Sequence, residues 1–157
     1  MPDPAADPTY LAFQYGTAER LQIRQETHDK YSEGANDWFD WILDHLALSP
    51  GMRVLDVGCG NGKYLQPLHQ RQCRVVGTDA SFGMVTTARE GAEAAIIRAA
   101  FLQAQAEALP IATASFERVM ANHMLYHVPD QLAALRELRR VVKPGGIVLC
   151  ATNAANT

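Results

Sequence analysis

One run of nine residues, Val54 to Gly62 (VLDVGCGNG), constrains the fold of this chain more than any other segment. A short apolar stretch containing an acid leads into a loop with glycine at every second position. Glycine has no Cβ, so such a loop can adopt positive φ and let a ligand lie against its main chain. Residues 64–69 can then open a helix. Strand, glycine loop and helix together are the arrangement of a nucleotide-type site at the carboxyl end of a parallel strand.

Strand-like and helix-like segments alternate along the chain after residue 50. Four of the expected strands are near-continuous apolar runs, which is typical of strands covered on both faces. The alternation predicts an α/β fold with a doubly wound, mostly parallel sheet and helices on both faces. We expect strands at 53–57, 74–78, 99–103, 116–121 and 147–151, helices at 62–70, 83–95 and 130–142, and a turn at 143–146.

The chain of 157 residues divides into three expected parts. Residues 1–16 are predicted to form a flexible tail, residues 17–48 a helical cap, and residues 49–157 the α/β core. Within the cap we expect helices at 17–30 and 38–46, and we favour a core or lid-packing role for Trp38 and Trp41 over a stacking site. Apolar spacing also predicts buried helix stripes, namely Met84, Ala88 and Ala92, and Leu132, Leu135, Leu138 and Val142.

Charge and cysteine content limit the partners. The net charge is −3, which argues against nucleic acid, and the densest basic stretch ends an expected helix, where cations complement the helix dipole. No apolar run approaches the roughly 20 residues that cross a bilayer. Three cysteines without metal-ligand spacing suit a reducing compartment, so we expect a cytoplasmic protein with no membrane partner and no metal site. The basic stretch comprises Arg136, Arg139, Arg140 and Lys143.

Two acids beside the glycine loop narrow the ligand class. Asp79 ends the second expected strand, where it can accept hydrogen bonds from two vicinal ribose hydroxyls. Asp56 can accept from a ligand ammonium or fix the loop through backbone N–H groups. A dinucleotide fingerprint needs glycine at the sixth position from Gly58, where this chain has Lys63. A nucleoside with an amino-acid tail therefore fits better than a dinucleotide.

An ordered set of motifs over residues 54–152 resembles the class I methyltransferases that use S-adenosylmethionine. Residues 56–62 resemble the first motif of that family and residues 75–84 the second. Residues 106–116 resemble its A-E-x-L-P-F…S-F-D segment, 122–128 the motif after strand four, and 139–146 its R-V-L-K-P-G-G turn. The resemblance implies a Rossmann-like fold and S-adenosyl-L-methionine as cofactor. Glu117 and Arg118 depart from the pattern, and we expect both at the surface.

The resemblance also implies roles for individual residues. Asp56 would lie beside the cofactor's amino group, the glycine loop against its methionine and ribose portion, and Asp79 at its ribose. Ala80 and Met84 would pack on the adenine, and the segment from Gln105 would border the adenine edge. The implied cofactor-binding set is Tyr31, Asp56, Gly58, Cys59, Gly60, Gly62, Asp79, Ala80, Met84, Gln105, Ala106, Glu107, Asn122 and His123.

The resemblance implies methyl transfer to a small-molecule acceptor. Methyl transfer needs a general base only when the acceptor must lose a proton. His123 and His127 are four residues apart and would share a face of a helical turn, so they are the catalytic candidates. The alternative is that one of them packs against the helix and the other is solvated. We expect Cys59 to pack rather than react. A cofactor-binding module without catalysis is the alternative function, and a nicotinamide-dependent oxidoreductase the third.

The family fold has seven strands, and this chain ends after the fifth expected one. We therefore expect a truncated form of the fold in which the last two strands are missing. An uncovered strand edge favours pairing with another chain, so we expect a homo-oligomer through the edge of strand five.

Overall fold

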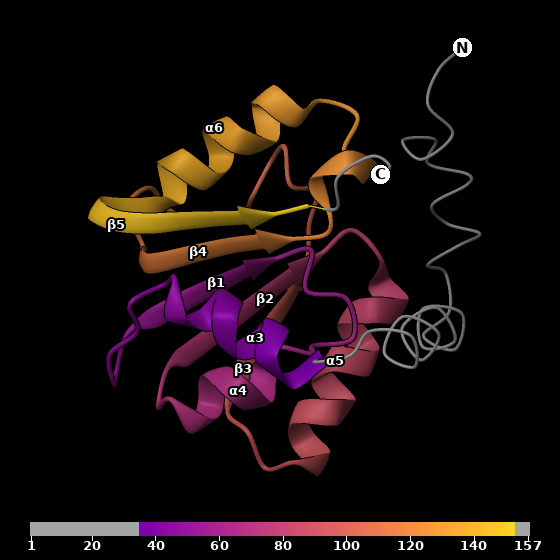
Figure 1. Ribbon diagram of the computed structural model, residues 1–157. Coiled ribbons are helices and arrows are strands. Elements are labelled where there is room, and N and C mark those ends of the chain that lie inside the picture. Colours follow the sequence, from indigo (N-terminus) through magenta and orange to yellow (C-terminus); the bar gives the residue numbers. More distant parts are fainter. Residues whose placement is uncertain (1–34, 153–157) are drawn as a thin grey trace.

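The computed structural model describes residues 35–152. The expected tail, the expected helix at 17–30 and Tyr31 lie outside this range, and the division of the chain at residue 49 stays a prediction. The elements are α3 (Ala35–Asp44), β1 (Arg53–Val57), α4 (Leu65–Gln70), β2 (Arg74–Asp79), α5 (Phe82–Ala94), β3 (Ala99–Gln103), β4 (Phe116–Asn122), the 3-10 helix η2 (Leu125–His127), α6 (Gln131–Val141) and β5 (Val142–Ala151) (Figure 1).

The five strands form one parallel sheet in the order β3-β2-β1-β4-β5. Leu55 at the centre of β1 is in register with Val76 of β2 on one side and with Val119 of β4 on the other. From β1 the chain builds outward through β2 and β3, and then returns to place β4 on the opposite side of β1. This change of direction is the switch point at which α/β sheets bind ligands. The expected parallel, doubly wound sheet is confirmed.

Helices cover both faces of the sheet (Figure 1). Alternate residues of β1 belong to different clusters, with Val54 packed among α3, α4 and α5, and Leu55 packed beneath α6. This period of two is what a strand buried on both faces requires. In α5 the expected stripe of Met84, Ala88 and Ala92 is buried. The core therefore consists of two layers, one on each side of a sheet whose carboxyl edge carries the glycine loop.

Helix α6 confirms only part of the expected stripe, because Leu138 and Val142 are buried but Leu132 and Leu135 are not. Leu132 and Leu135 are 57% and 44% exposed, whereas Ala134, Leu138 and Val141 are buried. The helix begins at Gln131 because the Asp130 carboxylate caps it, accepting from the Ala133 N–H at 2.9 Å. The leucine spacing alone could not identify the buried face, because a second apolar row shares the same periodicity.

The two tryptophans of α3 do not enter the core. Trp38 and Trp41 are 40% and 52% exposed, and their rings stack with centroids 5.3 Å apart. The core side of this segment is supplied by Ile42, Leu43 and Leu46, each at most 1% exposed. Their exposure contradicts a core role, whereas lid packing, the other part of that expectation, stays a prediction. The aliphatic residues that follow them in the chain fill the core side instead.

The expected turn at 143–146 is a bulge within β5. Phe116 pairs with Val142 and Arg118 with Ile147, so two steps along β4 correspond to five along β5. Gly145 takes a φ of +77° in the bulge. At Gly146 an added Cβ would lie 2.7 Å from the Glu117 carbonyl oxygen. Both glycines are therefore required by the main-chain path between α6 and the straight part of β5.

The side chains of Glu117 and Arg118 connect segments that are far apart in the sequence. The Glu117 carboxylate accepts from the Arg53 N–H at 2.7 Å and pairs with Lys143, and these contacts lower its pKa to about 2. The Arg118 guanidinium donates to the carbonyl oxygens of Leu46 and Ala47, beyond the end of α3. Both side chains are partly exposed, which agrees with the expected surface position, but their partners, up to 72 residues away in the sequence, were not predicted.

Candidate ligand site

The glycine loop follows β1 at the carboxyl edge of the sheet. Gly58, Gly60 and Gly62 have φ of +72°, +55° and +85°, as their pattern predicts. The Thr78 carbonyl oxygen accepts from the N–H groups of both Gly58 (2.7 Å) and Cys59 (2.9 Å), which ties the loop to the end of β2. Because of the left-handed conformation at Gly62, α4 begins at Leu65 rather than at residue 62.

Asp79 stands where β2 ends and holds two segments of main chain. One carboxylate oxygen accepts from the Gly60 N–H and the other from the Ser81 N–H, both at 2.9 Å. Burial raises the pKa of Asp79, and the two N–H donors oppose that shift. An ionised carboxylate offers about four acceptor positions, so two remain for a ligand. The structure thus places Asp79 against the glycine loop, with acceptor capacity to spare.

Asp56 lies inside β1 and has a different environment. Its side chain is 4% exposed, and no hydrogen bond from a described residue reaches its carboxylate. Burial, followed by the nearby Asp79 charge, raises the pKa of Asp56 to about 8. The loop is fixed by Thr78 and Asp79, so of the two roles expected for Asp56, the role in fixing the loop is absent. A buried acid of this kind marks a candidate ligand contact.

The raised pKa of Asp56 predicts how stability depends on pH. Its folded pKa of about 8 exceeds its ordinary value of 3.8, so the folded state holds a proton that the unfolded state releases. The stabilising contribution of this group is complete below pH 3.8 and is lost as pH rises through about 8. We expect the thermal midpoint of the ligand-free protein to fall across this window, and Asp56→Asn to flatten the fall. Melts from pH 5 to 8 measure this.

The exposed Asp44 carboxylate supplies the control for that experiment. Its side chain is 75% exposed, so Asp44→Asn should retain the wild-type dependence on pH. Identical slopes for the wild type and the Asp56 variant would contradict the assignment.

Cys59 and Tyr64 complete the loop and the turn that follows it. Burial, with the charges of Asp56 and Asp79, raises the pKa of the Cys59 thiol well above its ordinary value, which agrees with the expected packing role. Tyr64 is buried against the edge of Phe39, with ring centroids 4.9 Å apart. Burial, then the Asp56 charge, raises the pKa of Tyr64 to about 12, and a hydrogen bond with the Trp38 side chain opposes the shift.

At the end of β4 the structure places a buried amide beside a histidine. Asn122 is 8% exposed, and within residues 35–152 both polar atoms of its side chain are buried without a hydrogen-bond partner. Side chains alternate along a strand, so Asn122 lies on the same face of the sheet as Met120, beneath α3, α4 and α5. His123 follows with a φ of +54°, and its ring lies 5.8 Å from that of Trp38.

The two candidate histidines do not share a helical face. The left-handed conformation at His123 interrupts the expected turn, and the 3-10 helix begins only at Leu125. His127 packs its ring against Tyr126, with centroids 4.3 Å apart. The expected common face is therefore wrong. The His123 ring contacts that of Trp38 in α3.

The loop after β3 carries the residues expected at the adenine edge. Gln105 is exposed, Ala106 is 6% exposed and Glu107 is half-buried, in a turn closed by the Ala108 N–H on the Gln105 carbonyl oxygen at 3.1 Å. The Ala104 N–H donates to the Asp79 carbonyl oxygen at 3.0 Å, which joins this loop to the end of β2.

The expected adenine contacts beyond β2 are not equally accessible. Ala80 is exposed, but Met84 is 1% exposed and belongs to the core, so a contact between Met84 and a ligand would require its side chain to move. Phe82, two residues after Ala80, is 64% exposed and was missed by the sequence analysis. The Thr78 carbonyl anchor was missed as well, because no side-chain pattern signals a main-chain acceptor.

In the described part of the chain, no helix is long and apolar enough to cross a membrane. Residues 35–152 also contain no group of three or more histidine, cysteine, aspartate or glutamate side chains arranged to hold a metal ion.

The strand order, with a glycine loop at the switch point, defines a Rossmann-like α/β domain. The chain belongs to the methyltransferase domain family, whose sequence model matches residues 55–150. It is 39% identical over 102 residues to the ubiquinone biosynthesis O-methyltransferase of Dinoroseobacter shibae, covering 65% of this chain and 41% of that protein. It is 35% identical over 142 residues to the malonyl-[acyl-carrier protein] O-methyltransferase of Erwinia pyrifoliae, covering 90% and 50%. The chain thus spans about half the length of these curated relatives or less.

Solved structures share the fold. A SAM-dependent methyltransferase from Aquifex aeolicus superposes with a TM-score of 0.63 and 27% identity, over 68% of this chain and 58% of that one. The [4+2]-cyclase SpnF superposes with a TM-score of 0.70 and 28% identity, over 76% and 48%. Similar domains are therefore described both as a methyltransferase and as a cyclase.

Proposed function

We propose that this chain binds S-adenosyl-L-methionine and transfers its methyl group to a hydroxyl oxygen of a small-molecule acceptor. The observation that carries the proposal is that two buried polar side chains, Asp56 and Asn122, lie at the carboxyl edge of β1 and β4, and that both polar atoms of Asn122 have no hydrogen-bond partner within residues 35–152. Such groups are costly unless a ligand or water satisfies them. Two relatives named as O-methyltransferases support the choice of oxygen.

The residues present suit this cofactor. The bound cofactor would supply an electrophilic methyl group on a sulfonium, so the protein has only to bind, orient and exclude water. Asp56 would hold the ammonium, the loop from Gly58 to Gly62 the methionine and ribose portion, and Asp79 the ribose hydroxyls. Gln105, Ala106 and Glu107 would border the adenine, with Ala80 and, after a side-chain movement, Met84 on its face. Tyr31 is proposed on the resemblance alone.

His123 is the proposed general base for an acceptor hydroxyl, with Asn122 beside it. Its position after β4 and its contact with Trp38 support this role. His127 is the weaker candidate, because its ring packs on Tyr126. A base at His123 would accept the proton that an acceptor hydroxyl loses when it is methylated.

The alternative is a domain that binds the cofactor without transferring its methyl group. The similarity to a protein described as a [4+2]-cyclase supports this alternative, because that protein is associated with another chemistry on a similar fold. We also propose a cytoplasmic location, no nucleic-acid or membrane partner, and a homo-oligomer through the outer edge of β5. Only one edge of β5, the one facing β4, is paired among the described residues.

The test combines binding with turnover. Calorimetry with S-adenosylhomocysteine and with NAD is expected to show binding of the first only, and tritiated S-adenosylmethionine with a panel of phenols and carboxylic acids should give a labelled product. His123→Gln should lower turnover by a larger factor than it weakens the affinity for S-adenosylhomocysteine. Binding without any labelled product would favour the alternative function. Preference for NAD would overturn both. A monomer by light scattering at high concentration would remove the oligomer proposal.

A further inference from the structure

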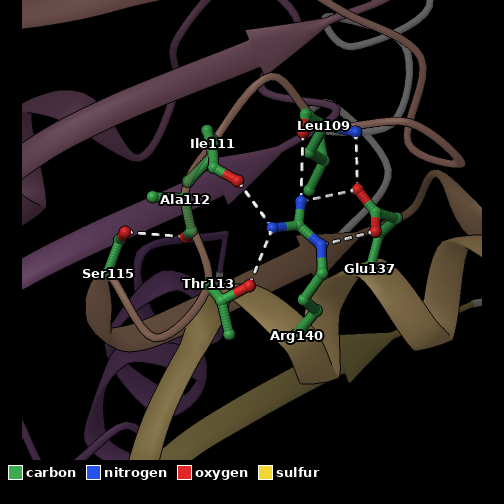
Figure 2. Close-up of polar contacts among 7 residues, drawn as sticks. All are labelled: Leu109, Ile111, Ala112, Thr113, Ser115, Glu137 and Arg140. Atoms are coloured by element: carbon green, nitrogen blue, oxygen red, sulfur yellow. Dashed lines mark hydrogen bonds and ion pairs between the residues drawn. The ribbon is translucent and has the colours of Figure 1, made fainter.

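An ion pair on helix α6 forms hydrogen bonds with the loop that precedes β4. The Arg140 guanidinium and the Glu137 carboxylate meet through two parallel hydrogen bonds of 2.7 and 2.8 Å. In the sequence, Arg140 belongs to a basic stretch that is expected to complement the helix dipole. Figure 2 shows instead that its guanidinium points away from the helix axis into the neighbouring loop.

The pair uses its remaining hydrogen-bonding capacity on that loop. Arg140 donates to the carbonyl oxygens of Leu109 (3.1 Å) and Ile111 (2.7 Å), and Glu137 accepts from the Leu109 N–H at 2.7 Å (Figure 2). The main chain adds a further bond, from the Ala114 N–H to the Arg140 carbonyl oxygen at 2.9 Å. Both side chains are at most one-third exposed. A two-pronged, partly buried pair of this kind fixes geometry as well as adding energy.

The opposite end of the same loop is fixed to β2. The Ala104 N–H bonds the Asp79 carbonyl oxygen, and the Gln103 side-chain amide donates to the Ala80 carbonyl oxygen, both at 3.0 Å. Between these two attachments lies the turn from Gln105 to Ala108. The turn proposed to border the adenine is therefore held from two sides, by β2 and by α6.

We propose that Glu137 and Arg140 are positioning residues that hold the turn from Gln105 to Ala108 in the conformation that reads the purine edge of a nucleoside ligand. The inference rests on the proposed function, because it takes the ligand to be an adenosine derivative. Neither residue needs to touch the ligand. They act through the main chain of Leu109, two residues beyond Glu107.

The experiment compares two ligands that differ at the base edge. Adenine presents a donor at C6 and an acceptor at N1, whereas hypoxanthine presents the reverse, so a fixed turn distinguishes them and a released turn does not. In Arg140→Met we expect the Kd for S-adenosylhomocysteine to rise about tenfold and that for S-inosylhomocysteine to change less than about threefold. Arg139→Met, an exposed arginine on the same helix, is the matched control and should match the wild type.

A readout without ligand separates positioning from general destabilisation. Hydrogen exchange should show the Leu109 amide protected in the wild type and in Arg139→Met, and exchanging faster in Arg140→Met, while amides of β1 stay protected. Should Arg140→Met not fold, Glu137→Gln, which keeps the shape and one oxygen, replaces it with the same expected pattern. Equal losses for both ligands, or unchanged affinity in a folded variant, overturn the inference and leave the proposed function standing. A wild type that binds neither ligand overturns both.

Discussion

Replacing Asp79 with alanine is expected to raise the Kd for S-adenosylhomocysteine by at least about 100-fold. The carboxylate bonds the main chain of Gly60 and Ser81 and is the proposed acceptor for the ribose hydroxyls. Each hydrogen bond to a charged group contributes roughly 1.5–3 kcal/mol, so losing two ligand bonds corresponds to roughly two to four decades in affinity. Isothermal calorimetry on the wild type and the variant measures the change.

A deoxyribose ligand separates the ribose contacts of Asp79 from its effect on the loop. The wild type should bind the 2′-deoxy analogue of S-adenosylhomocysteine more weakly than the parent compound, and Asp79→Ala should bind the two alike. Asp44→Ala, which removes an exposed carboxylate from α3, should leave both affinities unchanged. If Asp79→Ala binds the parent ligand as tightly as the wild type does, the ribose assignment is wrong.

Substituting Gly58 with alanine is expected to be the most damaging single change in the loop. Gly58 has a φ of +72°, and a Cβ there would lie 2.7 Å from the Cβ and Cγ of Met124. Left-handed backbone costs a non-glycine residue roughly 1–2 kcal/mol, and overpacking adds roughly 1–3 kcal/mol. A loss of roughly 2–5 kcal/mol is a large part of a typical domain's stability. Urea unfolding of the variant measures it, and ligand binding should weaken in parallel.

Two other glycines serve as controls that separate the cost of left-handed backbone from the cost of overpacking. Gly51 has a φ of +85° with open space around it, so Gly51→Ala should show the backbone term alone, roughly 1–2 kcal/mol. Gly91 lies exposed in α5 with no atom within 4 Å of an added Cβ, so Gly91→Ala should stabilise by roughly 0.5–1 kcal/mol. A Gly58→Ala variant no less stable than Gly51→Ala would contradict the packing of Met124 on the loop.

The elements that could be predicted from the sequence are those whose local pattern agrees with their burial. β1, β2 and α5 were placed within one residue at each end, because apolar runs and a serine cap mark them directly. Positive φ in the glycine loop could be predicted for the same reason, since glycine at alternate positions serves little other purpose. The parallel, doubly wound sheet followed from the alternation of strands and helices together with the handedness of their crossovers.

The failures share a physical cause, which is dependence on distant partners. Nothing near Arg140 in the sequence indicates that it binds the loop before β4, and nothing near Arg118 indicates that it caps the segment after α3. Whether α6 buries the face that carries Leu132 and Leu135 or the face that carries Ala134 depends on which part of the sheet the other elements leave uncovered. At His123 a single left-handed residue breaks a helical periodicity that the spacing alone suggests.

The most direct measurement of the central claim is a crystal structure of the protein soaked with S-adenosylhomocysteine. The account predicts density for the ribose at the Asp79 carboxylate, for the amino-acid portion along the main chain from Gly58 to Gly60 with its ammonium toward Asp56, and for the base beside Gln105. Density for the ligand at any other place, or a fully occupied ligand whose ribose makes no contact with Asp79, would contradict it.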